Sequence, residues 1–327
     1  MKKTAQRVIL GAALGLAAMT GSTVAGAQSY PTRAITVIVP FAGGSASDVV
    51  TRIMLDKMSK SMGQPMIVEN RPGAGGNTGT GAAAKAAPDG YTLVGSGSGP
   101  FAANKVLYKE LGYDPVKDFE VISPFAYFNI VIVASTKLPV KTLKELIDYA
   151  KAHPGQLNYG SVGIGSSQHL SGEYFQQVAG VKMTHVPYRN IAQYGPDLIA
   201  GQVPLGFQWL PNVNAPLKSG GARALAVAAK TRMKALPDVP TTAEAGLPEY
   251  VASGWFAMAA PKGTPKAIVE RLNKEMAAAL ADPGVREKFL QQGAEPGVMP
   301  PAEAVKFVEA EMKKWGGIIT KAGIPKL

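Results

Sequence analysis

The sequence predicts an α/β protein built of two lobes, each a mixed sheet flanked by helices, with a cleft between them. Units of strand, glycine-rich loop and helix follow one another from residue 35 to beyond residue 101, and a second such series begins near residue 142. Two long apolar stretches, 121–135 and 251–261, interrupt the series. Alternating strands and helices form open sheets covered by helices, and 46% apolar residues supply enough material for a large core.

The first 27 residues have the pattern of a secretory signal peptide. Lys2, Lys3 and Arg7 form a basic start, and residues 8–19 are an apolar run too short to span a bilayer. The small residues Ala25-Gly26-Ala27 form a cleavage sequence, so we expect cutting after Ala27 and a periplasmic location. The remaining chain of about 300 residues has the size at which a single core divides, which favours two lobes.

The first lobe opens with a continuous β-branched run at 35–39, which is typical of a buried parallel strand. Further strands are predicted at 66–68 and 91–94, and helices at 48–62, at 78–86 and from residue 101. After Asp114-Pro115 the rhythm breaks. The stretch 121–135 is therefore expected to be two strands, or one strand that crosses between the lobes.

The second series begins with a helix at 142–152, which Thr142 is expected to cap. It continues with strands at 157–160, 183–187, 203–207 and 222–228 and with a helix at 169–178. The stretch 251–261 returns to the first lobe, where helices at 266–281 and 301–320 carry apolar stripes. The predicted lobes are therefore 28–128 with 255–327, and 129–254. The two crossings form a hinge beside a ligand cleft.

Three Gly-Ser loops, at 42–47, 95–99 and 160–167, each follow a strand and open a helix. The first N–H groups of a helix have no partner within it and carry partial positive charge, and glycine lets a ligand approach them. Such loops bind carboxylate or phosphate groups, although tight turns alone also explain glycine there. Together the loops predict an anion site that draws on both lobes.

Polar side chains beside these loops allow more than one interpretation. Asp48 lies in a first helical turn, where a carboxylate is stabilising; in a cleft it would order the loop, hold a water or meet a ligand donor. His169 is either structural or a pocket residue, and Arg189 is either a carboxylate clamp or part of an ion pair. An exported hydrolase using Ser161 or Ser166 with His169 is an alternative, but the G-x-S-x-G elbow is missing and no acid is placed for the histidine.

Other functions are excluded by composition and motif. The chain has no cysteine, which excludes disulfides and thiolate catalysis, and its three histidines lack metal-ligand spacing. It has no phosphate-loop or dinucleotide fingerprint. Its net charge of +11 is not gathered into basic runs interleaved with aromatic residues. We therefore predict a protein that is not an enzyme and has no cofactor, no metal and no nucleic-acid partner.

A series of motifs occurs in order along the chain: VPFAGG (39–44) with Asp48, VENRPGAGGN (68–77), PDGYTL (88–93), YD with KDF (113–119), YGS and HL (159–170), HVPYR (185–189), PDVPT (237–241) and APKGTP (260–265). In this series the chain resembles the periplasmic substrate-binding proteins of tripartite tricarboxylate transporters, the Bug family. The resemblance covers essentially the whole chain after residue 27.

The resemblance implies a Venus flytrap fold that closes on a small carboxylate and delivers it to a membrane permease with a large and a small subunit. It places one ligand carboxylate between the first-strand loop and the second-lobe loop, partly through ordered water. These roles transfer to Phe41, Gly43, Gly44, Ser161, Gly165, Ser166 and His169, with Asn77, Ser96 and Ser98 placed by their loops. Asp48, Tyr188 and Arg189 complete the predicted binding site. The protein is expected to be a monomer, and a sensing subunit of a signalling system would bind the same ligand.

Two segments depart from the family pattern. Residues 190–196 are NIAQYGP where small residues are usual after the Pro-Tyr-Arg motif, and Pro204 stands where the family usually has an acid. The bulky residues of this region are Ile191, Tyr194, Phe207 and Trp209. They favour a flat or aromatic acid as ligand if they line the site, whereas large aromatic side chains more often pack in a core.

Overall fold

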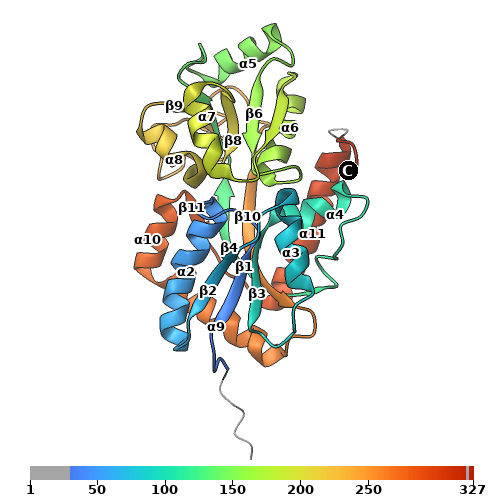
Figure 1. The fold of residues 1–327 in the computed structure, drawn as a ribbon. Helices are drawn as coiled ribbons and strands as arrows, with labels where there is room; N and C mark the ends of the chain where they lie inside the picture. The colour runs from blue at the N-terminus through green and yellow to red at the C-terminus, as the bar shows by residue number, and fades with distance from the viewer. Residues whose placement is uncertain (1–29, 322–323) are drawn as a thin grey trace, which may run out of the picture. The chain divides into compact units, whose positions relative to one another are not determined.

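The structure is a computed structural model that describes residues 30–321 and 324–327. The predicted signal peptide and its cleavage site lie outside the described residues. From Arg33 onward the chain forms one compact unit that contains two mixed sheets (Figure 1). We call each sheet with its helices a lobe. The predicted two-lobed α/β fold is therefore confirmed, whereas the residue bounds of the lobes stay a prediction.

The first lobe has a six-stranded sheet in the order β11-β4-β10-β3-β1-β2. Strands β2 and β3 lie parallel to β1, whereas β10 runs antiparallel to its neighbours β3 and β4, and β11 runs antiparallel to β4. The strands are β1 (Ile35–Val39), β2 (Met66–Asn70), β3 (Thr92–Gly97), β4 (Phe119–Asn129), β10 (Ser253–Pro261) and β11 (Ala294–Pro296).

The second lobe has a five-stranded sheet in the order β7-β6-β8-β5-β9. Strand β6 is parallel to β7 and β8, and β5 is antiparallel to β8 and β9. The strands are β5 (Val131–Ser135), β6 (Asn158–Ser161), β7 (Thr184–Pro187), β8 (Leu205–Gln208) and β9 (Ala222–Val227). Its helices are α5 (Leu143–Ala152), α6 (Ser167–Ala179), η3 (Ile191–Gln193), α7 (Tyr194–Ala200) and α8 (Leu210–Lys218).

Two groups of helices cover the first sheet (Figure 1). Helices α2, α9 and α10 contact one another, and α11 packs on η2 and α4. The helices of this lobe are α2 (Ala46–Met62), η1 (Ala74–Gly76), α3 (Asn77–Ala84), η2 (Gly99–Ala103), α4 (Asn104–Leu107), α9 (Lys266–Ala281), α10 (Pro283–Gln291) and α11 (Pro301–Lys321). Helices α7, α8 and α10 were not among the elements that the sequence predicts.

Local sequence explains where several helices begin and end. The Thr142 hydroxyl accepts a hydrogen bond from the Glu145 N–H, and the Glu145 carboxylate accepts one from the Lys141 N–H, so the predicted cap of α5 is confirmed. Gly63 ends α2 in the left-handed conformation at φ 69°. These ends are set by neighbours in sequence, independently of the tertiary fold.

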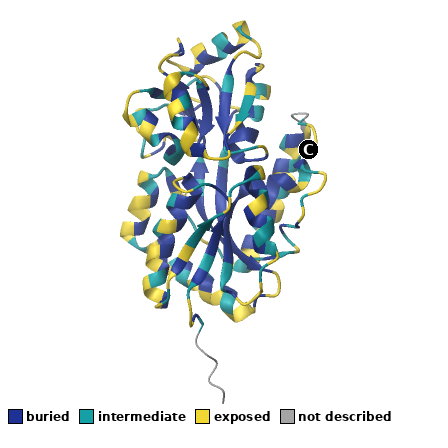
Figure 2. Ribbon diagram, viewed as in Figure 1, coloured by how far each residue is buried: buried dark blue, intermediate teal, exposed yellow. Residues whose placement is uncertain are grey.

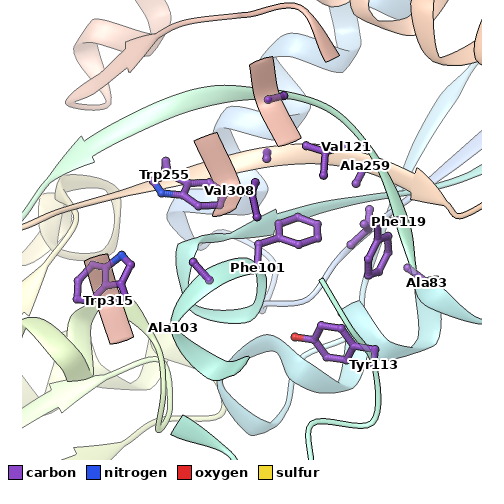
Figure 3. Close-up of a cluster of buried hydrophobic side chains, with 14 of the residues drawn as sticks. Ala83, Phe101, Ala103, Tyr113, Phe119, Val121, Trp255, Ala259, Val308 and Trp315 are labelled. Atoms are coloured by element: carbon purple, nitrogen blue, oxygen red, sulfur yellow. The ribbon is translucent and has the colours of Figure 1, made fainter. Parts of the chain in front are cut away.

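The strands of both sheets are largely buried (Figure 2). In the first lobe Phe101 lies among Trp255, Val308 and Phe119 (Figure 3). Its ring is stacked on Trp255 at 6.5 Å and meets Phe119 edge-on at 5.4 Å. This cluster joins η2 to α11, β4 and β10, and so holds the C-terminal helix on the sheet.

The chain crosses between the two sheets at Ile130 and again before β10. Ile130 is the single residue between β4 and β5, so the apolar stretch 121–135 is two strands that belong to different sheets. The Ile130 N–H donates to the Ala252 carbonyl at 3.0 Å, and the Ala228 N–H donates to the Ile130 carbonyl at 2.8 Å. The Ala252 N–H in turn donates to the Ala228 carbonyl at 3.1 Å. Backbone hydrogen bonds thereby connect the three segments at Ile130, Ala228 and Ala252 where the chain crosses between the sheets.

Candidate functional site

Loops from both lobes enclose a cavity of about 500 Å³. From the first lobe come the loop after β1 (Phe41, Ala42, Ser45), the loop after β2 with Thr78, and Tyr108. From the second lobe come residues 162–164 after β6, and at the end of β7 the residues Pro187, Tyr188, Arg189 and Ile191. The strand ends that carry these loops belong to the parallel parts of the two sheets, where ligands of α/β proteins bind.

Direct contacts close the two lobes around this cavity. The Tyr108 hydroxyl donates to the Ile164 carbonyl at 3.1 Å, and the hydroxyls of Ser98 and Ser167 lie 2.7 Å apart. Gly75 has φ 61°, and a Cβ at this position would overlap the Ile164 carbonyl oxygen. A side chain at residue 75 would therefore hold the two loops apart.

Asp48 is buried behind the first loop and holds it in shape. Its carboxylate accepts hydrogen bonds from the Gly44 N–H, from Arg52 Nε and from Asn70 Nδ2, each at 2.9 Å. Asn70 Nδ2 also donates to the Phe41 carbonyl at 3.0 Å. Burial alone would raise the pKa of Asp48, but the hydrogen bonds from Arg52, Gly44 and Asn70 outweigh it and hold that pKa below its usual range. In this arrangement Asp48 orders the loop, one of the roles that the sequence left open.

The second-lobe loop is held by two neighbouring histidines, the buried His169 and the partly buried His185. Ser161 Oγ lies 2.6 Å from His185 Nε2, and the Gly165 N–H donates to His169 Nδ1 at 3.2 Å. The two imidazole rings are 4.2 Å apart between centroids. Burial lowers the pKa of His169 to about 4, and burial together with repulsion from His169 lowers that of His185 to about 3. Both rings are therefore neutral at pH 7, and both act as hydrogen-bonding partners of the loop backbone and of Ser161.

The predicted site residues fall into two groups. Phe41, Tyr188 and Arg189 line the cavity. The others are not among the residues that line it: Gly43, Gly44, Asp48, Asn77, Ser96, Ser98, Ser161, Gly165, Ser166 and His169. Among these, Ser166 caps α6 by accepting from the His169 N–H, and Ser96 lies 2.8 Å from the Thr80 hydroxyl. Their role as ligand-binding residues stays a prediction.

The walls offer hydrogen-bond donors and one positive charge. Arg189 is the single charged side chain among the described residues that line the cavity, and it forms no ion pair with any of them. Ala42, Ala74 and Ile164 also line the cavity, and within the described ranges their N–H groups donate no hydrogen bond. Unpartnered N–H groups beside a guanidinium suit an anion.

Some lining residues were not among those the sequence predicts. The residues of the loop at 72–75 line the cavity but were not predicted. A signal was present, because the glycines of this loop directly follow β2, beside the loop after β1. Tyr108 carries no sequence signal, because it reaches the cavity only through the packing of α4. Of the bulky residues that favour an aromatic ligand, Ile191 lines the cavity. Tyr194 and Phe207 are fully buried, with their rings 5.5 Å from Tyr188 and 5.6 Å from Tyr159, so their size is explained by the core.

A family model described as the tripartite tricarboxylate transporter family receptor matches residues 50–324. The chain belongs to this receptor family. It is 39% identical over 298 residues to the protein BugT of Bordetella pertussis, an alignment that covers 91% of each chain. The solved structure of the periplasmic binding protein BugD is 35% identical, with a TM-score of 0.87 over 91% of this chain and all of that one.

Two solved structures of R. palustris proteins were determined with carboxylates. One is described with adipate and is 38% identical, with a TM-score of 0.88 over 91% of this chain and 100% of the other. The second is MatC from Rhodopseudomonas palustris with bound malate, which is 34% identical, with a TM-score of 0.83 over 89% of this chain and 100% of the other. These similarities confirm the predicted family.

The receptor family also decides between binding and catalysis. Its members are periplasmic solute-binding proteins and not enzymes, as the sequence predicts. The buried Ser161 pairs with His185 rather than with His169, and its hydroxyl also accepts from the Gly163 N–H at 3.0 Å. The hydroxyl is thereby engaged in shaping the loop. Among the described helices, none is long and apolar enough to cross a bilayer.

Proposed function

We propose that this receptor captures a small organic carboxylate between its lobes in the periplasm and delivers it to a tripartite membrane permease with a large and a small subunit. The observation that carries the proposal is the cavity wall, where Arg189 and the N–H groups of Ala42, Ala74 and Ile164 have no partner among the described residues. A carboxylate supplies acceptors for such donors, and hydrogen bonds between charged groups are the strong ones.

The wall favours a carboxylate whose remaining part is apolar and short. Phe41, Pro72, Tyr108, Val162 and Ile191 supply apolar surface around the donors. The two R. palustris relatives were solved with the aliphatic dicarboxylates adipate and malate. We therefore propose a C4–C6 aliphatic acid. An aromatic acid stays the alternative, supported by Ile191 at the cavity and no longer by Tyr194 and Phe207.

A thermal-shift and calorimetry screen tests the ligand class. The acids are aliphatic C4–C6 di- and tricarboxylates and benzoate-type acids, each compared with its neutral amide. A carboxylate present at 100 times its Kd should stabilise the protein by about 2.7 kcal/mol. Equal binding of acid and amide would contradict the carboxylate site, and tighter binding of benzoates would reverse the aliphatic preference.

Arg189→Ala tests the cation of the site. We expect at least tenfold weaker binding of the best acid, which corresponds to about 1.4 kcal/mol. Arg286→Ala is the matched control, because Arg286 is an exposed arginine on α10 and its loss changes the net charge equally. The same affinity in both variants would show that Arg189 does not contact the ligand.

Export and delivery need separate tests. N-terminal sequencing of the protein from a periplasmic fraction should begin at Gln28, directly after the proposed cleavage site. Uptake of the labelled acid should be lost when the gene is deleted and restored by the wild-type chain. Normal uptake with a lost transcriptional response to the acid would instead favour a sensing role. Size-exclusion chromatography with light scattering checks the expected monomer.

A further inference from the structure

A second, smaller cavity lies directly behind the main one. It shares Phe41, Ser45 and Val162 with the main cavity, and its other walls are Ala46, Ser47, Gln168, Trp209 and Asn212. Its volume of about 10 Å³ is room for roughly one water-sized group. We call it the inner chamber. It contains residues of both lobes, so it exists only when the lobes are closed.

Two buried polar side chains that line the inner chamber have no partners. Gln168 is 1% exposed, and neither its Nε2 nor its Oε1 forms a hydrogen bond with the described residues. Trp209 is 3% exposed, and its Nε1 is likewise without an acceptor in the described part of the chain. Buried polar groups are normally hydrogen-bonded. Two donors and one acceptor beside the same small space therefore indicate a polar occupant.

The neighbouring donors and acceptors of the chamber are already engaged. The Ala46 N–H at the start of α2 donates to Asn212 Oδ1 at 3.0 Å, and Asn212 Nδ2 donates to Gln208 Oε1 at 3.0 Å. The hydroxyls of Ser45 and Ser47 lie 3.0 Å from each other. The side-chain polar atoms of the chamber that have no partner in the described part of the chain are thus those of Gln168 and Trp209, at the positive end of the 17-residue helix α2.

Packing fixes the Trp209 ring independently of any occupant. Its ring is stacked on Phe128 at 5.2 Å and meets Phe256 edge-on at 4.8 Å. The apolar face of the indole is therefore part of the core between the lobes, while its N–H is left to hydrogen-bond in the chamber. Phenylalanine at this position would keep an aromatic ring against Phe128 and Phe256 and remove the donor together with part of the indole.

We propose that Gln168 and Trp209 form an inner subsite that binds a single oxygen atom and thereby sets ligand affinity. The oxygen is either a hydroxyl or carbonyl substituent of the captured acid or a water that the acid contacts. Both sources have the same chemistry, an oxygen that accepts from Gln168 Nε2 and Trp209 Nε1. This inference rests on the proposed function, because the subsite deepens the same carboxylate pocket.

The experiment measures the affinities of two acid pairs that differ by one hydroxyl, succinate with malate and adipate with 2-hydroxyadipate. Calorimetry is done on the wild type, Gln168→Leu, Trp209→Phe and the control Thr51→Val. Thr51 also has a buried, unpartnered hydroxyl, but it lies on α2 away from both cavities. The melting temperature of each variant is measured without acid.

If the ligand supplies the oxygen, Gln168→Leu should weaken binding of the hydroxy acid at least tenfold and binding of the unsubstituted acid less than threefold. If water supplies the oxygen, Gln168→Leu should weaken binding of both acids of each pair at least tenfold. Trp209→Phe should follow the same pattern more mildly. The melting temperature of Gln168→Leu should be unchanged or higher, because the amide has no partner to lose.

Affinities of both variants within twofold of the wild type for every acid would overturn the subsite. A lower melting temperature with an unchanged affinity would show that Gln168 is only structural. If none of the four acids binds the wild type, the proposed C4–C6 aliphatic ligand is wrong for these dicarboxylates, and the proposed subsite is wrong as well. If the acids bind equally to all four proteins, only the subsite fails.

Discussion

Replacing Asp48 by alanine should destabilise the protein strongly, although Asp48 does not line the cavity. Asp48 is 4% exposed and accepts three hydrogen bonds, from the Gly44 N–H, Arg52 Nε and Asn70 Nδ2. Removing the carboxylate leaves the Gly44 N–H in the loop after β1 without its acceptor, and leaves Asn70 Nδ2 at the end of β2 with the Phe41 carbonyl as its remaining acceptor. The loop that lines the cavity loses its support at the same time.

The magnitude follows from these three bonds. Hydrogen bonds to a charged group contribute about 1.5–3 kcal/mol each. The Arg52 side chain is 51% exposed, so its bond is screened by solvent and contributes little. The two remaining bonds give about 3 kcal/mol, which for a folded chain of about 300 residues lowers the melting temperature by roughly 5 °C. Asp48→Asn should lose nearly as much stability, because the NH₂ group that replaces one carboxylate oxygen would face N–H donors instead of accepting from them.

Thermal and guanidinium unfolding of wild type and Asp48→Ala measure the loss. Asp56→Ala is the control, since Asp56 lies on the same helix and its ion pair with Lys60 is exposed on both sides. The control should stay within about 0.5 kcal/mol of the wild type. Because the pKa of Asp48 is lowered, its stabilisation is present above the usual aspartate pKa of 3.8 and is lost as the pH falls through its lower folded pKa. Asp48→Ala and Asp56→Ala of equal stability at pH 7 would refute this account of the loop.

Two further predictions concern the second-lobe loop. The pKa values of His169 and His185 are lowered to about 4 and about 3 in the folded protein. Between these values and pH 6.5, both histidines therefore bind protons in the unfolded chain but stay neutral in the folded one. The free energy of unfolding should therefore be highest above the unfolded histidine pKa of about 6.5. As the pH drops towards 4, each of the two histidines should lower it by up to about 1.4 kcal/mol per pH unit. Guanidinium unfolding at several pH values measures this, and a His185→Gln variant with the wild-type slope would contradict it. Gly75→Ala should weaken the best acid at least tenfold, because the added Cβ at φ 61° overlaps the Ile164 carbonyl and keeps the lobes apart; calorimetry with unchanged affinity would show that the loops do not need this contact.

Two of the helices that the sequence does not predict, α8 and α10, contain proline. Helix α8 contains Pro211 in its first turn and Pro216 inside, and α10 begins at Pro283. The cap of α10 was nevertheless visible in the sequence, because Asp282 accepts from the Gly284 and Val285 N–H groups directly before a helix that starts with proline. Proline in a first helical turn is favourable, so this helix could have been predicted, whereas an internal proline such as Pro216 depends on tertiary packing.

Sequence patterns by themselves determined the fold class, the family and the site loops after β1 and β6, but not the lining loop at 72–75. These depend on local physics: β-branched runs extend, glycine turns after a strand leave helix N–H groups bare, and Thr142 caps its own helix. Tertiary structure alone decided which side chains meet. The parallel register of β6 and β7 pairs Tyr159 with His185 and so brings that histidine, rather than His169, to Ser161. Packing within the second lobe likewise places Gln168 and Trp209 at one chamber, because partners distant in sequence are chosen by packing and not by spacing.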